Sequence, residues 1–102
     1  YFTPKMRTYL VEFQNNLDQT TRILNQNLNE TQEEVSIKQA EFIEKTINTI
    51  YKEAEANLMK TIEKEKLLTT SALFYKDLIQ NYEILGDHLY KANATIVKLK
   101  NQ

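Results

Sequence analysis

Glycine and proline, on which most turns depend, are almost missing from this sequence: Gly86 and Pro4 are the only examples in 102 residues. Average usage is about 7% for glycine and about 5% for proline. Because β-rich and loop-rich folds place these residues in their turns, the depletion favours long helices. Apolar residues make up 41% and charged residues 26% of the chain, which is typical of a globular domain rather than a disordered segment.

Further absences narrow the class of protein. Cysteine does not occur, which excludes disulfides, thiolate zinc sites and a thiol nucleophile. No apolar run approaches the roughly 20 residues of a membrane span. The net charge is −1 with acidic and basic residues interleaved, so no positive field predicts a nucleic-acid partner. The start, YFTPKMRTYL, has neither an initiator Met nor the apolar stretch of a signal peptide. We expect one domain, residues 1–102, excised from a longer protein.

Helical apolar periodicity predicts helices over residues 4–28, 32–65 and 70–100. Thr3 suits the N-cap of the first helix, and Pro4 suits its first position because the missing N–H has no partner there. Thr31 and Glu34 form a capping box before the second helix. The predicted core stripes are Met6, Leu10, Phe13, Leu17, Thr20, Leu24 and Leu28; then Ala40, Ile43, Ile47, Ile50, Ala54, Leu58 and Ile62; then Leu78, Tyr82, Leu85, Leu89, Ala92, Ile96 and Leu99. Ala72, Ile79, Tyr90 and Val97 widen the third stripe, as expected of a helix that packs on two partners.

Three long helices with short connections predict an all-α fold, an up-down-up antiparallel three-helix bundle. The alternative is that the first two helices merge across residues 25–31 into a helical hairpin that must oligomerise. The polar break LNQNLNE and the capping box favour the bundle.

The stretch NYEILGDHL, residues 81–89, contains the only glycine and the only histidine of the chain. With Leu85 at the centre of the core stripe, Glu83 and Asp87 lie near 160° and 200°, on the opposite face and about 6 Å apart at their Cβ atoms. A cation bridging the two carboxylates would relieve their repulsion. Alternatively, Asp87 pairs with Lys91 and the two acids belong to a solvated face.

Other residues near this stretch also have two interpretations. Gly86 either allows a close approach of helices or is merely tolerated, at about 1 kcal/mol relative to Ala. His88, placed at the edge of the core, is more typical of a hydrogen-bonded boundary histidine than of a metal ligand or pH sensor. Glu41 and Glu44 would add carboxylates if they faced Asp87, although a solvated face is the commoner role.

Residues 71–96, SALFYKDLIQNYEILGDHLYKANATI, resemble the last helix of a PhoU-like phosphate-regulation repeat. The run Tyr82 to His88 matches the L-E-R-I-G-D-H-like pattern of that helix at its Glu, Gly, Asp and His. The order of an apolar helix, a polar break and a Glu-rich helix is also similar. The resemblance implies a three-helix repeat and, at Glu83 and Asp87, ligands for a divalent or ferric cation. Asn81 stands where the family often has an acid, which leaves fewer ligands than a multinuclear cluster needs.

The resemblance also implies a function and a location. Single repeats occur as the soluble C-terminal domain of sodium/phosphate symporter-like proteins, so we expect a cytoplasmic regulatory domain tethered to the inner membrane through a membrane part of the same polypeptide. Its partner would be that part or another component of phosphate transport, and homo-oligomerisation is left open. One His, no Cys and no glycine-rich loop argue against an enzyme and against an organic cofactor. The alternative function is a purely structural or scaffolding bundle without a metal site.

Overall fold

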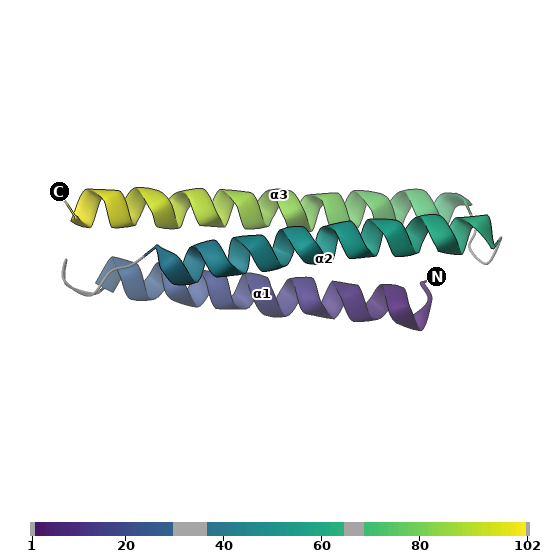
Figure 1. Cartoon of the computed structure of the whole chain (residues 1–102), viewed down its shortest axis with the longest axis horizontal. Helices are drawn as coiled ribbons and strands as arrows, with labels where there is room; N and C mark the ends of the chain where they lie inside the picture. The colour runs from purple at the N-terminus through teal and green to yellow at the C-terminus, as the bar shows by residue number, and fades with distance from the viewer. Residues whose placement is uncertain (1, 30–36, 65–68, 102) are drawn as a thin grey trace.

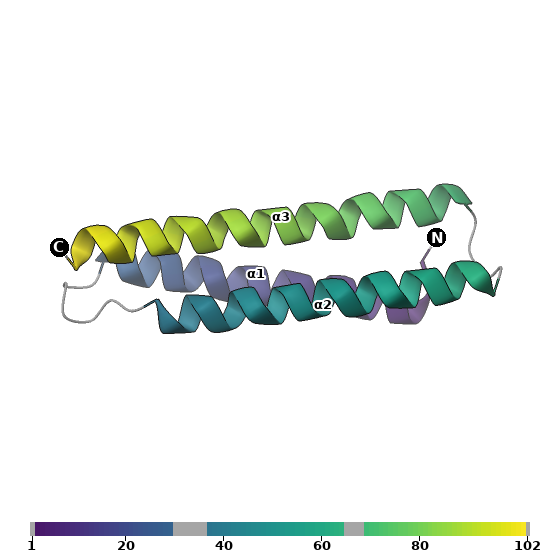
Figure 2. The ribbon, with the colours of Figure 1, turned by 45° about the horizontal axis from the view of Figure 1, so that its top comes forward.

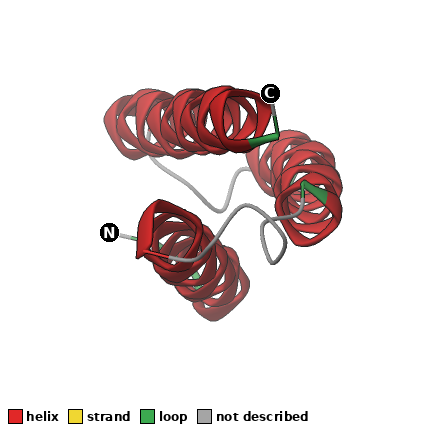
Figure 3. Ribbon diagram, turned by 90° about the vertical axis from the view of Figure 1, so that its left-hand side faces the viewer, coloured by secondary structure: helices red, strands yellow, loops and turns green. Residues whose placement is uncertain are grey.

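The computed structural model is a bundle of three antiparallel helices, and it describes residues 2–29, 37–64 and 69–101. Helix α1 spans Pro4–Asn29, α2 spans Lys38–Glu63 and α3 spans Thr69–Lys100. The helices run up, down and up beside one another, and they stand at the corners of a triangle when viewed along the bundle (Figures 1 and 3). The bundle measures 54 × 18 × 17 Å. The predicted fold is confirmed, and the merged hairpin is excluded because α1 and α2 pack side by side.

The helix ends follow the local chemistry of the sequence. Thr3 caps α1, because its Oγ1 accepts a hydrogen bond from the Met6 N–H at 3.2 Å. Helix α2 begins at Lys38, later than the predicted residue 32, and its cap residue Ile37 makes no side-chain hydrogen bond. The predicted capping box of Thr31 and Glu34 lies outside the described residues. Helix α2 ends at Glu63, and α3 begins one residue earlier than predicted.

The core stripe of α2 is where the sequence predicts it. The buried residues of this helix are Ala40, Ile43, Ile47, Ile50, Ala54 and Leu58. Only Ile62, the last residue of the predicted stripe, is exposed. Four isoleucines and leucines at this spacing each contribute about 1.5–3 kcal/mol by leaving water, so α2 supplies the most regular apolar surface on which α1 and α3 pack.

Helix α1 follows its predicted stripe for its first four turns and then departs from it. Met6, Phe13, Leu17 and Thr20 are buried as predicted. Further along, Asn27 is buried, whereas Leu24 is half-buried and Leu28 is exposed. The predicted stripe is therefore wrong at its end. The reason is a polar contact described below, which draws Asn27 inward.

Helix α3 is rotated relative to the prediction by about one residue, or about 100°. Its buried residues are Ala72, Tyr75, Ile79, Gly86, Asn93 and Val97. Leu85, predicted at the centre of the stripe, is 47% exposed, and Leu99 is 60% exposed. Residues that the sequence placed on the flank thus form the core, and the predicted centre lies outside. Tyr75 anchors this arrangement, because its buried hydroxyl donates to the Met6 carbonyl at 3.1 Å and burial raises its pKa to about 12.

Candidate functional site

At Gly86 the backbone of α3 lies close to side chains of both other helices. A Cβ placed on Gly86 would lie 3.0 Å from Cδ1 and 3.2 Å from Cγ2 of Ile47, and 3.8 Å from Cδ2 of Leu17. The glycine thus lets the α3 backbone rest directly on side chains of α2 and α1. This close approach fixes the rotation of α3 and, with it, the direction of the neighbouring acids.

Glu83 and Asp87 lie at the edge of the bundle, on the side of α3 that borders α2. Both residues are half-buried. Measured from Gly86, which faces the core, Glu83 lies at about 60° and Asp87 at about 100° around the helix. The prediction that the two acids point directly away from the core is therefore wrong. The wrong direction followed because the predicted core stripe of α3 was centred on Leu85.

Glu44 of α2 joins the two acids of α3. Burial raises the pKa of the Glu44 carboxyl above its ordinary 4.5, and the negative charges of Asp87 and Glu83 raise it further. The Asn48 amide partly offsets this, because its Nδ2 donates to Glu44 Oε1 at 3.4 Å. Helices α2 and α3 run side by side throughout this region (Figure 2). We call Glu44, Glu83 and Asp87 the acidic surface.

Lys91 provides the positive charge of this region. Its Nζ lies 2.9 Å from Oδ2 of Asp87, one helical turn away, in the pairing that the sequence offered as an alternative to a metal site. The hydrogen bond to Asp87 and the charge of that carboxylate raise the pKa of Lys91 above its ordinary 10.5. Lys91 is largely exposed, so water screens this pair. Asp87 is thus partly neutralised, whereas Glu44 and Glu83 have no salt bridge of this kind within the described residues.

Few side chains in this region could act as ligands of a metal ion. Across residues 2–29, 37–64 and 69–101, no three His, Cys, Asp or Glu side chains are grouped so that they could hold a metal ion together. The pair of Glu83 and Asp87 therefore offers two ligand side chains, fewer than the metal clusters that the PhoU-like resemblance implies. A single weakly held cation at this pair stays a prediction.

Two other sequence predictions near this site can now be assigned. His88 is exposed on the outer side of α3, so its predicted place at the edge of the core is wrong, for the same reason that the stripe of α3 is wrong. Of the two glutamates on the second helix, Glu44 does face Asp87. Glu41 is exposed in the first turn of α2. The sequence alone could not separate them, because the choice depends on the rotation of α3.

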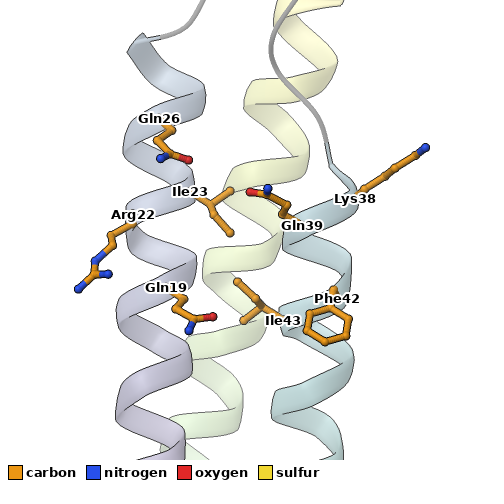
Figure 4. A pocket seen from close by; sticks show the side chains of 8 residues that line it. All are labelled: Gln19, Arg22, Ile23, Gln26, Lys38, Gln39, Phe42 and Ile43. Carbon is orange, nitrogen blue, oxygen red and sulfur yellow. The ribbon is translucent and has the colours of Figure 1, made fainter.

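A groove between α1 and α2 was not expected from the sequence. A hollow of about 470 Å³ is lined by Gln19, Arg22, Ile23, Gln26, Lys38, Gln39, Phe42 and Ile43 (Figure 4). Phe42 is 71% exposed and also borders a second hollow of about 540 Å³ further along the same pair of helices. Phe42 is the residue that could have indicated this groove from the sequence, because it is aromatic and does not belong to the predicted core stripe of α2.

By its fold the chain is an all-helical three-helix bundle domain. No protein-family model matches it, and neither a curated protein nor a solved structure is similar enough to count as a match. The PhoU-like resemblance therefore stays a prediction based on residues 71–96. None of the helices in the described ranges combines the length and the apolar character needed to cross a membrane.

Proposed function

We propose that this chain is a non-enzymatic regulatory domain of phosphate transport, which acts by binding a cation or a positively charged segment of a partner protein at its acidic surface. The observation that carries the proposal is that Gly86 brings α3 against α2 so closely that Glu44 and the pair of Glu83 and Asp87 share one edge. These are the residues at which the PhoU-like resemblance implies ligands. The bundle is also the architecture that such a repeat implies.

The partner in this proposal belongs to phosphate transport. It is either a membrane transporter portion of the same polypeptide, which would hold the domain at the cytoplasmic side of the inner membrane, or a separate component. Burial and the neighbouring carboxylates raise the pKa of Glu44, which supports a binding role, since a partly buried carboxylate beside like charges gains from a cationic neighbour. Catalysis is not part of the proposal, because the chain has a single histidine, which is exposed, and no cysteine.

A purely structural bundle is the second candidate, and a specific observation favours it. Lys91 already supplies Asp87 with a cation at 2.9 Å, as an ordinary solvated helix face would. In that case the acidic surface has no ligand, and the domain only spaces or connects other parts of a larger assembly.

The cation part of the proposal is tested by thermal unfolding with Mn²⁺, Fe³⁺ or Mg²⁺. A cation that binds only the folded state at about five times its dissociation constant adds about 1 kcal/mol to the free energy of unfolding. For a domain of this size we therefore expect Tm to rise by about 4–8 °C. Glu83→Gln combined with Asp87→Asn should remove the rise. The control is Glu12→Gln with Asp18→Asn on α1, which changes the net charge equally and should keep it.

The two parts of the proposal can fail separately. The absence of a Tm rise with all three ions would overturn cation binding and leave a protein partner as the ligand. The regulatory function itself is measured in the full-length polypeptide as phosphate uptake by cells grown with scarce and abundant phosphate. Uptake that is the same in the Glu83→Gln, Asp87→Asn variant and the parent under both conditions would favour the structural bundle.

A further inference from the structure

Helix α3 carries a second apolar face, which is centred about 100° around the helix from Gly86 and the core. It is formed by Phe74, Leu78, Leu85, Ala92, Ile96 and Leu99, and we call it the outer face. Phe74 is 71% exposed, and Leu85 and Leu99 are also exposed, whereas Leu78, Ala92 and Ile96 are half-buried at its border with the core. Helices α1 and α2 both lie on one side of α3 (Figure 3), and they leave Phe74, Leu85 and Leu99 exposed.

The outer face is free of charge along its whole length. The nine residues within about 50° of Leu85 around the helix are Ser71, Phe74, Leu78, Asn81, Leu85, Leu89, Ala92, Ile96 and Leu99. Charged residues make up 26% of the chain, so an ordinary solvated face of this length would carry some. The nearest lysine, Lys100, reaches sideways to α1, where its Nζ donates to the Leu28 carbonyl at 2.7 Å. This face is built for contact with another apolar surface rather than with water.

The residues of the outer face are placed symmetrically about Leu85. Leu78 and Ala92 lie seven positions before and after it, and Phe74 and Ile96 lie eleven positions before and after it. When two such faces meet in opposite directions with Leu85 on the two-fold axis, each Leu78 lies opposite the small Ala92 of the other copy. The large Leu78 then faces a small side chain, which is the arrangement that lets facing layers interdigitate, and Phe74 lies opposite Ile96.

We propose that the outer face of α3 binds the outer face of a second copy of this chain, antiparallel and with a two-fold axis at Leu85. Self-pairing of an uncharged face brings no like charges together. From Phe74 to Leu99 the strip is about 38 Å long and about 10 Å wide, on the order of 400 Å² for each copy. A standard interface buries about 800 Å² for each partner. Because the strip has about half of that area, the dimer is of the weak, micromolar kind.

Sedimentation equilibrium between about 1 µM and about 1 mM protein tests the dimer. We expect the mass to rise with concentration from 12.1 kDa towards twice that value. Leu85→Lys places two like charges on the axis and should weaken association at least about tenfold. The control is Val11→Lys, which adds the same charge at an exposed apolar residue of α1 and should leave association unchanged. An equimolar mixture of Leu85→Lys and Leu85→Glu should restore it, because opposite charges then meet on the axis.

Single cysteines test the register, since the chain has none of its own. A residue on a two-fold axis meets its own copy, so Leu85→Cys should form a disulfide-linked dimer under mild oxidation. Phe74→Cys should not link to itself, because the two copies of residue 74 would lie about 33 Å apart. Mixed with Ile96→Cys, it should form the heterodimer.

Three results would overturn the proposal. The first is a mass of 12.1 kDa at every concentration, which would mean that the outer face binds a different protein. The second is a dimer that Leu85→Lys does not weaken while circular dichroism shows the variant folded. The third is self-linking of Phe74→Cys, which would indicate parallel helices if Leu85→Cys also links to itself and an antiparallel pair with its axis near residue 74 if it does not.

Discussion

Gly86 is the residue on which the arrangement of α3 depends. Two explanations were open from the sequence, a close approach of helices or a tolerated defect. The structure supports the first, because the space that a side chain would need is taken by Ile47 at 3.0 and 3.2 Å. The same residue decides which side of α3 borders α2. One missing methyl group therefore places Glu83 and Asp87 beside Glu44.

Alanine at position 86 should lower stability. The added methyl group meets the buried Ile47, and overpacking of this kind costs about 1–3 kcal/mol. Better helix propensity returns up to about 1 kcal/mol, so we expect a net loss in the free energy of unfolding measured with urea. Ile47→Val removes the atom at 3.0 Å and should reduce the cost of Gly86→Ala. Ile50→Val, which removes the same methylene elsewhere on α2, should leave that cost unchanged. A Gly86→Ala protein more stable than its parent would contradict the packing explanation.

At the scale of the helix, the sequence predicts each element well and its rotation less well. The core stripe of α2 follows directly from its isoleucine spacing, because that helix has one apolar face. Helix α3 has two apolar faces, and apolar periodicity alone favours the face with more leucines. The true core face contains Gly86, which has no side chain, and Asn93, which is polar, so hydrophobicity alone could not identify it.

The candidate site shows the same limit. The pair of Glu83 and Asp87 could be predicted from spacing within one helix, as could the partnership of Asp87 and Lys91. The contribution of Glu44 could not, because it depends on how α2 and α3 are rotated against each other. Contacts within one helix are thus readable from a single sequence, whereas contacts between helices require the packing.

Glu44 predicts how the contact between α2 and α3 responds to pH. Its pKa is higher in the folded chain than its ordinary 4.5, so the folded state holds this proton more tightly. Stability contributed by the protonated carboxyl is present below pH 4.5 and is lost as pH rises through the folded pKa. We therefore expect Glu44→Gln to unfold at higher urea concentration than its parent at pH 7, with a difference that shrinks below pH 4.5. Glu53→Gln, an exposed change on the same helix, should give no such trend. A Glu44→Gln protein that is less stable than its parent at pH 7 would contradict the view that burial and repulsion by Asp87 disfavour the charged carboxylate.

For the whole bundle, a buried polar layer joins α1 to α3 near one end. Asn27 Nδ2 donates to Asn93 Oδ1 at 3.2 Å, and Asn93 Nδ2 lies 3.4 Å from the carbonyl and the hydroxyl oxygens of Thr20. Asn93 and Thr20 are almost fully buried. Polar groups in such places add less stability than apolar ones but disfavour other registers, in which they would lose their partners. This layer explains why Asn27 replaces Leu28 in the core of α1.

Substituting both asparagines of the layer separates its effect on stability from its effect on the register of the helices. Asn93→Leu alone leaves the Asn27 amide and Thr20 unpaired in the core and should cost about 1–3 kcal/mol, whereas adding Asn27→Leu removes the stranded partner and should recover much of that loss. We expect a coupling of about 0.5–3 kcal/mol in urea unfolding. As a control, Asn57→Leu on α2, whose buried Oδ1 has no hydrogen-bond partner among the described residues, should add independently to Asn93→Leu. If the layer sets the register, the double variant should also show broadened or doubled NMR amide signals in α1 and α3. Additive costs for Asn27→Leu and Asn93→Leu, together with one sharp set of signals, would mean that apolar packing alone determines how α1 meets α3.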